Sequence, residues 1–114
     1  MLTLEQKTAA VVSALEDVKG EHITVLDTHK LSPLFERIVI ASAQSTRQTK
    51  ALADNVVDKL LELGERPRST EGIRSGEWVL VDLGDVVVHV MQPAVRAYYN
   101  LEELWGGQPL ARAA

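Results

Sequence analysis

The chain has 114 residues with 12 basic and 16 acidic side chains, which gives a formal net charge of −4. This length is typical of one domain that buries roughly two-thirds of its unfolded surface. No apolar run approaches the ~20 residues of a membrane-spanning helix, and the first residues do not resemble a signal peptide. The absence of cysteine excludes disulfide bonds, a thiolate nucleophile and zinc–sulfur sites. These features predict a cytoplasmic globular protein.

The negative charge is concentrated in one part of the chain. Residues 76–105 hold five acidic side chains and one basic side chain, Arg96, whereas the rest of the chain is balanced. Affinity for nucleic acids comes mostly from Lys and Arg contacts to phosphates, so we expect no direct binding to nucleic acid. A protein partner with a basic surface fits better. The alternative is that these acidic side chains only keep the domain soluble.

The first part of the chain predicts one helix and two strands. The sequence T-L-E-Q at 3–6 is a capping box, and apolar residues at helical spacing extend the helix over about 4–19. Runs rich in β-branched residues follow at 22–27 and 37–42. The segment 28–36 between them contains a proline and predicts a loop.

A second helix is predicted in the middle of the chain. The sequence S-T-R-Q at 45–48 is another capping box, and the helix that it opens should extend to about residue 63, where Gly64 ends it. The following segment, 65–77, contains one proline and two glycines and predicts a connection rich in turns.

The strongest local signal is a hairpin between the runs 78–83 and 86–91, which a Gly-Asp dipeptide separates. A two-residue loop with Gly first suits a type II′ turn. Pairing Leu83 with Val86 sets the register of both strands. Because side chains alternate across a strand, one face is then wholly apolar: Val79, Val81, Leu83, Val86, Val88 and Val90. We expect the two long helices to cover this face.

The end of the chain predicts short helical turns. Pro93 can open a short helix, and Asn100 can cap another turn that ends at Trp105. We expect a single domain over 1–107, with a mobile tail at 108–114.

The predicted elements define a fold class. The strand 37–42, the helix 46–63 and the strand 78–83 form a βαβ unit, so we expect the two strands to run parallel with a right-handed crossover. The strand 86–91 adds an antiparallel neighbour. The expected fold is therefore α/β, a small mixed β-sheet with two main helices on one face.

The opposite face of the hairpin is a candidate partner-binding surface. It carries both apolar and polar side chains, and no third long helix is available to cover it. We interpret Trp78 as an anchor, because a large aromatic at such an edge either meets a partner or leaves an apolar patch. Residues of the last third extend the surface. The candidate partner-binding residues are Trp78, Leu80, Asp82, His89, Met91, Tyr98 and Glu102.

Hypotheses of catalysis or metal binding rest on Asp82, Asp85 and His89. Asp85 stands in a turn, where Asp is ordinary, and the diagonal placement of Asp82 and His89 on one face favours a cross-strand ion pair. A metal site needs a third ligand, and neither His22 nor His29 has a recognisable spacing. No phosphate-binding loop or G-x-S-x-G motif is present. We expect no metal, no cofactor and no enzymatic activity.

The chain resembles the ribosomal silencing factor (Iojap-like) family in two stretches. These are W-V-L-V-D-L-G-D-V-V-V-H-V-M at 78–91 and R-A-Y-Y-N-L-E-E-L-W at 96–105. The similarity continues upstream through I-V-I-A-S-A-Q-S-T-R-Q at 38–48 and covers the chain from about residue 5 to 107. The combination of the hairpin with L-E-E-L-W is specific for this family.

The resemblance implies a nucleotidyltransferase-like fold without established enzymatic activity, and homodimers in some members. It also implies a translational repressor that binds the large ribosomal subunit through its ribosomal protein fourteen. There the repressor blocks joining of the ribosomal subunits sterically and lowers translation under nutrient limitation. Two alternatives stay open: a metal-dependent nucleotidyltransferase-like enzyme that uses Asp82 and Asp85, and a direct RNA binder.

Overall fold

The computed structural model describes residues 2–104 and 109–113. Within them the chain forms four helices and a six-stranded sheet with the strand order β3-β4-β5-β2-β1-β6. In chain order the elements are α1 (Leu4–Asp17), β1 (Glu21–Asp27), β2 (Arg37–Ser42), α2 (Thr46–Glu62), β3 (Ser69–Glu71), β4 (Trp78–Asp82), β5 (Val86–Met91), α3 (Pro93–Tyr99), α4 (Leu101–Leu104) and β6 (Pro109–Ala113). The predicted end of the last helical turn, Trp105, lies outside the described residues.

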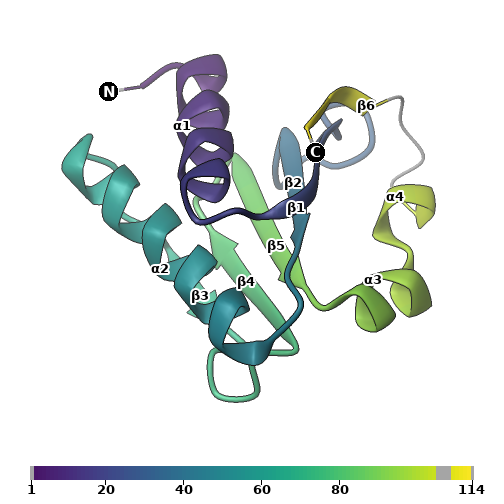
Figure 1. The fold of residues 1–114 in the computed structure, drawn as a ribbon. Coiled ribbons are helices and arrows are strands. Elements are labelled where there is room, and N and C mark those ends of the chain that lie inside the picture. The colour runs from purple at the N-terminus through teal and green to yellow at the C-terminus, as the bar shows by residue number, and fades with distance from the viewer. Residues whose placement is uncertain (1, 105–108, 114) are drawn as a thin grey trace.

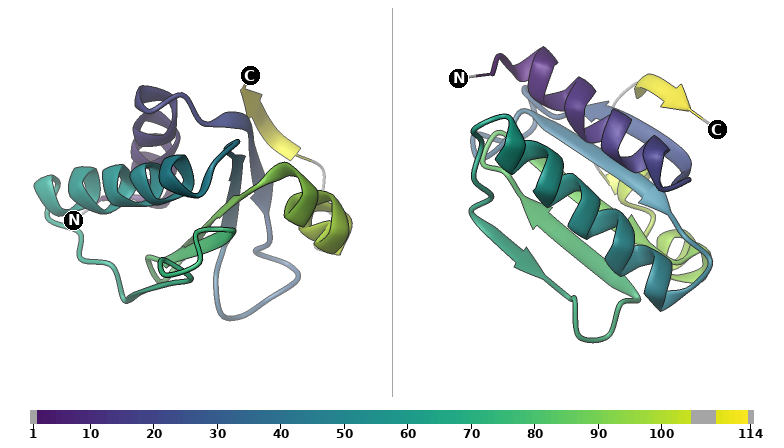
Figure 2. Two further views of the ribbon diagram at one scale, coloured as in Figure 1. Left: turned by 60° about the horizontal axis from the view of Figure 1, so that its bottom comes forward. Right: turned by 60° about the vertical axis from the view of Figure 1, so that its left-hand side comes forward.

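The helices form two unequal layers around the sheet. Helices α1 and α2 lie together on one face, and the short helices α3 and α4 lie on the other side (Figures 1 and 2). The sheet is mixed, because β2 and β5 are parallel and its other pairs are antiparallel. The predicted class, an α/β fold with a small mixed sheet and two main helices on one face, is confirmed. A nucleotidyltransferase-like fold stays a prediction.

The hairpin has the predicted register. Val81 pairs with Val88, and Leu80 pairs with His89. The N–H of Leu83 donates to the carbonyl oxygen of Val86 at 2.9 Å, which closes the turn. Gly84 has a φ of +96°, a conformation that a residue with a Cβ adopts only at a cost. Gly is therefore required at the first position of this loop.

The larger hydrophobic core lies between the sheet and helices α1 and α2. The predicted apolar face of the hairpin is buried there, with five of its side chains fully inaccessible: Val79, Val81, Val86, Val88 and Val90. The helices contribute side chains at three- and four-residue spacing, including Val11, Ala14 and Leu15 from α1 and Leu52, Val56 and Leu60 from α2. Burying each Val or Leu stabilises the fold by roughly 1.5–3 kcal/mol.

The predicted βαβ unit is wrong in its second strand. The strand that pairs parallel with β2 is β5, whereas β4 is antiparallel to β5 and lies one position farther out. Helix α2 returns the chain to the edge of the sheet, where β3 and β4 pair first. All six residues of β5 are buried, which suits a central strand, while β4, which lies one position nearer the edge of the sheet, alternates between buried and half-buried residues.

The two predicted capping boxes differ in the structure. At α1, Thr3 and Gln6 exchange both hydrogen bonds, as predicted. At α2, the Ser45 hydroxyl accepts the Gln48 backbone N–H, but the Gln48 side chain donates to the carbonyl oxygens of Val18 and Lys19. Gln48 therefore donates to carbonyl groups that have no partner within the helix at the end of α1, and these hydrogen bonds connect α1 to α2.

Two strands occur where the sequence predicts none. The three-residue strand β3 lies within the predicted turn-rich connection and pairs with β4. The strand β6 lies within the predicted mobile tail at 108–114 and pairs antiparallel with β1 at the edge of the sheet (Figure 1). Neither segment has an alternating apolar pattern, so neither carries a local signal for a strand. The mobility of the tail stays a prediction.

Candidate partner-binding site

A second, smaller hydrophobic cluster lies on the sheet face opposite α1 and α2. It consists of Leu26, Ile38, Ile40, Met91 and Leu101, with Phe35, Trp78 and Val95 packed against it. Leu101 belongs to α4 and Val95 to α3, so the two short helices cover one part of this face. The remainder, over β4 and β5, is left without a helix (Figure 2).

A hollow of about 410 Å³ lies over this uncovered part of the sheet. Ile38, Leu80 and Val87 line it from the strands, and Leu34 and Phe35 line it from the loop between β1 and β2. The hollow also includes polar or charged groups and the hairpin turn: Arg68, Glu71, Asp82, Gly84 and His89. An apolar hollow with a few polar groups is the usual form of a recognition site.

His89 and Trp78 are joined at the side of this hollow. The indole Nε1–H of Trp78 donates to Nδ1 of His89 at 3.0 Å. His89 is only 8% exposed, and burial lowers the pKa of its imidazole from 6.5 to about 4. The ring is therefore neutral at physiological pH, and it accepts a hydrogen bond through one of its nitrogens.

Aromatic side chains from α3 continue this surface beyond Trp78. The Tyr99 ring lies against Trp78 with centroids 4.7 Å apart, and Tyr98 meets Tyr99 edge-on at 5.1 Å. Tyr98 is 82% exposed and Tyr99 is 52% exposed. The three rings form an aromatic ridge (Trp78, Tyr98 and Tyr99) whose outer end is open to solvent. Such a ridge adds large apolar contact area for a partner.

The acidic side chains of the hairpin do not converge on one point. Asp82 Oδ1 accepts the backbone N–H of Gly84 at 2.8 Å, whereas Asp85 accepts a hydrogen bond from Lys7 at 2.7 Å. The predicted ion pair between Asp82 and His89 is wrong, because the side chain of His89 bonds to Trp78. Among the described residues, no group of three His, Asp or Glu side chains has the arrangement needed to hold a metal ion.

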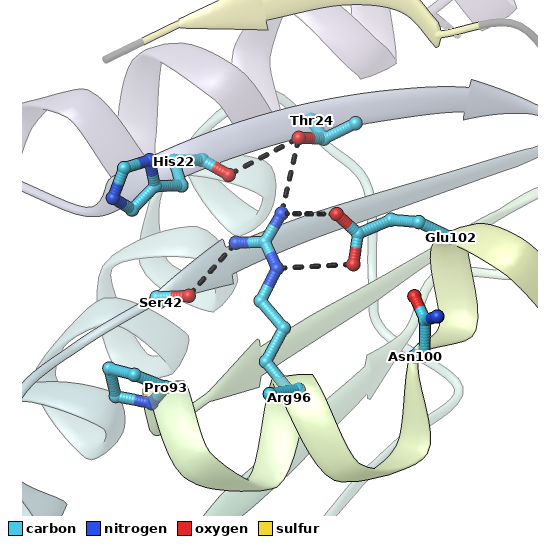
Figure 3. A pocket seen from close by; sticks show the side chains of 8 residues that line it. His22, Thr24, Ser42, Pro93, Arg96, Asn100 and Glu102 are labelled. Atoms are coloured by element: carbon cyan, nitrogen blue, oxygen red, sulfur yellow. Dashed lines mark hydrogen bonds and ion pairs between the residues drawn. The ribbon is translucent and has the colours of Figure 1, made fainter.

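A second hollow, of about 370 Å³, lies beside α3 and contains Arg96 (Figure 3). The Arg96 guanidinium donates to both carboxylate oxygens of Glu102 at 3.2 and 3.0 Å, to Ser42 Oγ at 2.9 Å and to Thr24 Oγ1 at 3.1 Å. Thr24 and Ser42 belong to β1 and β2, so this network fastens both short helices to the sheet. Four of the five guanidinium N–H groups are used in this way.

The structure brings together only some of the predicted partner-binding residues. Leu80, Asp82 and His89 meet at the hollow over β4 and β5. Trp78 and Tyr98 belong to the aromatic ridge beside it. The remaining two lie elsewhere. Met91 is fully buried, so the prediction that it contacts a partner directly is not supported by its position, and Glu102 faces Arg96 rather than the hollow.

Sequence reasoning missed several residues of these sites. Leu34 and Phe35 lie in a loop, but two adjacent apolar residues directly after a proline are a signal of packing or binding. The local sequence around Arg96 does not indicate its hydrogen-bond partners, because Ser42 and Thr24 are 54 and 72 positions away in the chain. The role of Arg96 depends on the sheet topology. Within the described ranges, no helix is long and apolar enough to cross a membrane.

The fold and the hollow define a small α/β domain with a concave surface suited to recognition. A family model described as "Ribosomal silencing factor during starvation" matches residues 2–113. The chain therefore belongs to the ribosomal silencing factor family, and the resemblance in its hairpin and L-E-E-L-W motif is confirmed. This is a family of regulators of translation.

Individual relatives agree with this assignment. A protein of Chromobacterium violaceum named "Ribosomal silencing factor RsfS" is 54% identical over 107 residues, which cover 94% of this chain and 88% of the relative. The Bacillus subtilis protein of the same name is 42% identical over 99 residues, covering 87% and 84% of the two chains. A crystal structure of a Chromobacterium violaceum protein superposes with a TM-score of 0.92 at 52% identity, covering 99% of this chain and 94% of that one.

Proposed function

We propose that this protein is a translational repressor that binds the large ribosomal subunit through ribosomal protein fourteen. Bound there, it blocks joining of the ribosomal subunits and lowers translation under nutrient limitation. The observation that carries the proposal is the uncovered face of β4 and β5, with its apolar hollow and aromatic ridge, in a member of the ribosomal silencing factor family. We infer no catalytic step and a site of action in the cytoplasm.

The apolar content of this face supports a protein partner. Leu34 is 77% exposed at the rim of the hollow, and Tyr98 is 82% exposed at the end of the aromatic ridge. Leaving large apolar side chains in water is unfavourable, and burying them against a partner recovers roughly 25 cal/mol per Å². The direct contacts that we propose are therefore Trp78, Leu80, Asp82, His89 and Tyr98.

The charges around this face support a basic partner, although fewer acids are available than the sequence suggests. Asp85 shares an ion pair with Lys7, which also pairs with Glu65, and Glu102 pairs with Arg96. Asp82, by contrast, forms no ion pair within residues 2–104 and lines the hollow. Its carboxylate can therefore meet a Lys or Arg of a ribosomal protein. The same carboxylate, together with Glu71 in the hollow, disfavours RNA phosphates.

The proposed mechanism is steric. The folded chain measures 32 × 32 × 24 Å. A body of this size on the joining surface excludes the other subunit without any chemical step. The degree of repression then depends on the concentration of the protein relative to its dissociation constant.

Sedimentation with isolated ribosomal subunits tests the proposal. We expect the purified protein to co-migrate with large subunits and not with small subunits, and to reduce the formation of intact ribosomes when both are mixed. Leu80→Asp should abolish co-migration. Leu61→Asp is the matched control, because Leu61 is an exposed leucine on α2, which covers the opposite sheet face. Co-migration with small subunits, or with neither, would contradict the proposal.

Two further measurements separate this proposal from its alternatives. The purified protein should bind isolated ribosomal protein fourteen. Calorimetry of the purified protein with a nucleotide and Mg²⁺ should show no binding. Binding to naked RNA with a steep loss of affinity in salt would favour the RNA-binding alternative. Sedimentation equilibrium of the free protein tests whether it forms a homodimer, as the resemblance implies for some members of the family.

A further inference from the structure

The hydrogen bond between Trp78 and His89 fixes where the imidazole carries its proton. An indole N–H can only donate, so Nδ1 of His89, which accepts it at 3.0 Å, must be unprotonated. A neutral imidazole has one N–H, and that proton must then be on Nε2. Burial keeps the ring neutral by lowering its pKa to about 4. Trp78 therefore selects one of the two tautomers of His89.

The protonated nitrogen of His89 is available to a ligand. No buried side-chain nitrogen or oxygen in the described part of the chain lacks a hydrogen-bond partner. Nε2 makes no hydrogen bond to any residue in 2–104, so it is not one of the buried atoms and must be reachable by solvent. His89 also lines the hollow over β4 and β5. His89 is therefore a residue of the hollow that can offer a neutral ring N–H to a ligand, and apolar side chains lie beside it.

We propose that Nε2–H of His89 donates a hydrogen bond to a carbonyl oxygen of the ribosomal protein that occupies this hollow, and that Trp78 is the positioning residue for this donor. The inference rests on the proposed function and deepens it. It identifies the occupant as a segment that presents an apolar side chain together with a neutral acceptor.

The other groups of the hollow favour a carbonyl over an anionic acceptor. Asp82 and Glu71 place two carboxylates there, opposed by the single charge of Arg68. An incoming phosphate or carboxylate would meet a net negative site, whereas a carbonyl oxygen carries no formal charge. The floor formed by Leu80 and Val87 can hold the apolar side chain that flanks that carbonyl.

Two substitutions of His89 separate its two hydrogen bonds. In His89→Gln, the amide nitrogen replaces Nε2 and keeps the donor in the hollow, but the acceptor for Trp78 is lost. In His89→Asn, the amide oxygen replaces Nδ1 and keeps the acceptor for Trp78, but the donor in the hollow is lost. We expect His89→Gln to bind large subunits within about threefold of wild type, and His89→Asn to bind about tenfold more weakly or worse.

The role of Trp78 is tested by nitrogen-15 NMR of the free protein. We expect the wild-type His89 ring to show a protonated Nε2 and a bare Nδ1 at pH 7. Trp78→Phe keeps an aromatic ring against Tyr99 but removes the indole N–H, so we expect a mixture of both tautomers and about two- to threefold weaker binding. A protonated Nδ1 in the wild-type protein would overturn the proposal, whatever the binding results.

The outcomes distinguish this inference from the proposed function. If the wild-type protein does not sediment with large subunits, the proposed function and this use of the donor both fail. If the wild-type protein and His89→Asn bind equally well, only the inference is overturned. If His89→Asn does not fold, the Gln variant still decides, because tenfold weaker binding by a folded His89→Gln would also overturn it. Thermal melts of each variant establish folding.

Discussion

The guanidinium of Arg96 holds the carboxylate of Glu102 through two hydrogen bonds, at 3.2 and 3.0 Å (Figure 3). Because Arg96 also bonds to β1 and β2, this pair fixes α3 and α4 on the sheet. Tyr99, at the end of α3, is thereby held against Trp78. A buried network at one end of the sheet thus determines the shape of the candidate binding surface.

Removal of Arg96 should loosen the short helices. The side chains of Arg96 and Glu102 are 11% and 29% exposed, so Arg96→Leu leaves a largely buried carboxylate without its partner. We expect a loss of about 3 kcal/mol in the free energy of unfolding, measured by urea denaturation. Glu102→Gln keeps a hydrogen-bond acceptor and should lose less. Equal stabilities for Arg96→Leu and wild type would show that the network does not hold the helices.

A charge in the larger core should unfold the protein. Val88 is fully buried under α1 and α2, so Val88→Asp places an unpaired carboxylate among valines. We expect no cooperative thermal transition. Leu80→Asp is the matched control, since Leu80 is on the opposite face of the same hairpin and is half-buried. A cooperative melt of Val88→Asp near the wild-type temperature would contradict the assigned core.

Loss of the Asp82 charge should weaken binding to large subunits. Asp82→Asn removes the carboxylate but keeps an oxygen that can accept the N–H of Gly84, so the turn is preserved. We expect slower association and a smaller dependence of affinity on salt. Glu16→Gln, an equal change of net charge at an exposed position of α1, should have no effect. If the affinities of wild type and Asp82→Asn for large subunits are the same at every salt concentration, the excess of acidic side chains serves only to keep the protein soluble.

Truncation of Trp78 should affect binding more than stability. Trp78 is half-buried, so Trp78→Ala should cost less than the roughly 3–5 kcal/mol expected for a fully buried aromatic, while binding to large subunits is abolished. Met91→Ala provides the contrast. Met91 is fully buried in the same small cluster, and its truncation should cost about 2–5 kcal/mol while the folded fraction still binds. If both variants lose binding only in proportion to stability, Trp78 is a core residue and not an anchor.

Stability should fall in acid because of His89. The unfolded chain takes up a proton near the ordinary pKa of 6.5, whereas the folded protein resists protonation of His89 until about pH 4. This contribution to stability is complete above pH 6.5 and is lost as the pH falls from 6.5 to about 4, by at most about 3 kcal/mol. His89→Gln lacks this titration. Its stability should therefore change less than that of wild type in urea denaturation at pH 7, 6, 5 and 4.

Much of the fold followed from local patterns. The alternation of valines between Val79 and Val90 determined which face of the hairpin is buried, and Gly84 marked the turn that sets its register. Residues at helical spacing located α1 and α2, and Thr3 located the start of α1. These features depend on interactions between neighbours in sequence, so they can be recognised without the tertiary structure.

The strand order could not be obtained in this way. The crossover from β2 was expected to place β4 beside it, but the position belongs to β5, which is buried along its whole length. Both hairpin strands are rich in Val, and local sequence does not record which of two paired strands lies inside. That choice depends on how the completed sheet packs under α1 and α2.

The sequence by itself determined the family, the two helices and the two faces of the hairpin, because each is encoded by residue spacing or by a contiguous motif. Only the tertiary structure decided which polar residues meet. His89 bonds to Trp78 rather than to Asp82, and Arg96 collects partners from β1, β2 and α4. Hydrogen bonds need alignment within a few tenths of an ångström, and for these side chains the folded sheet provides it.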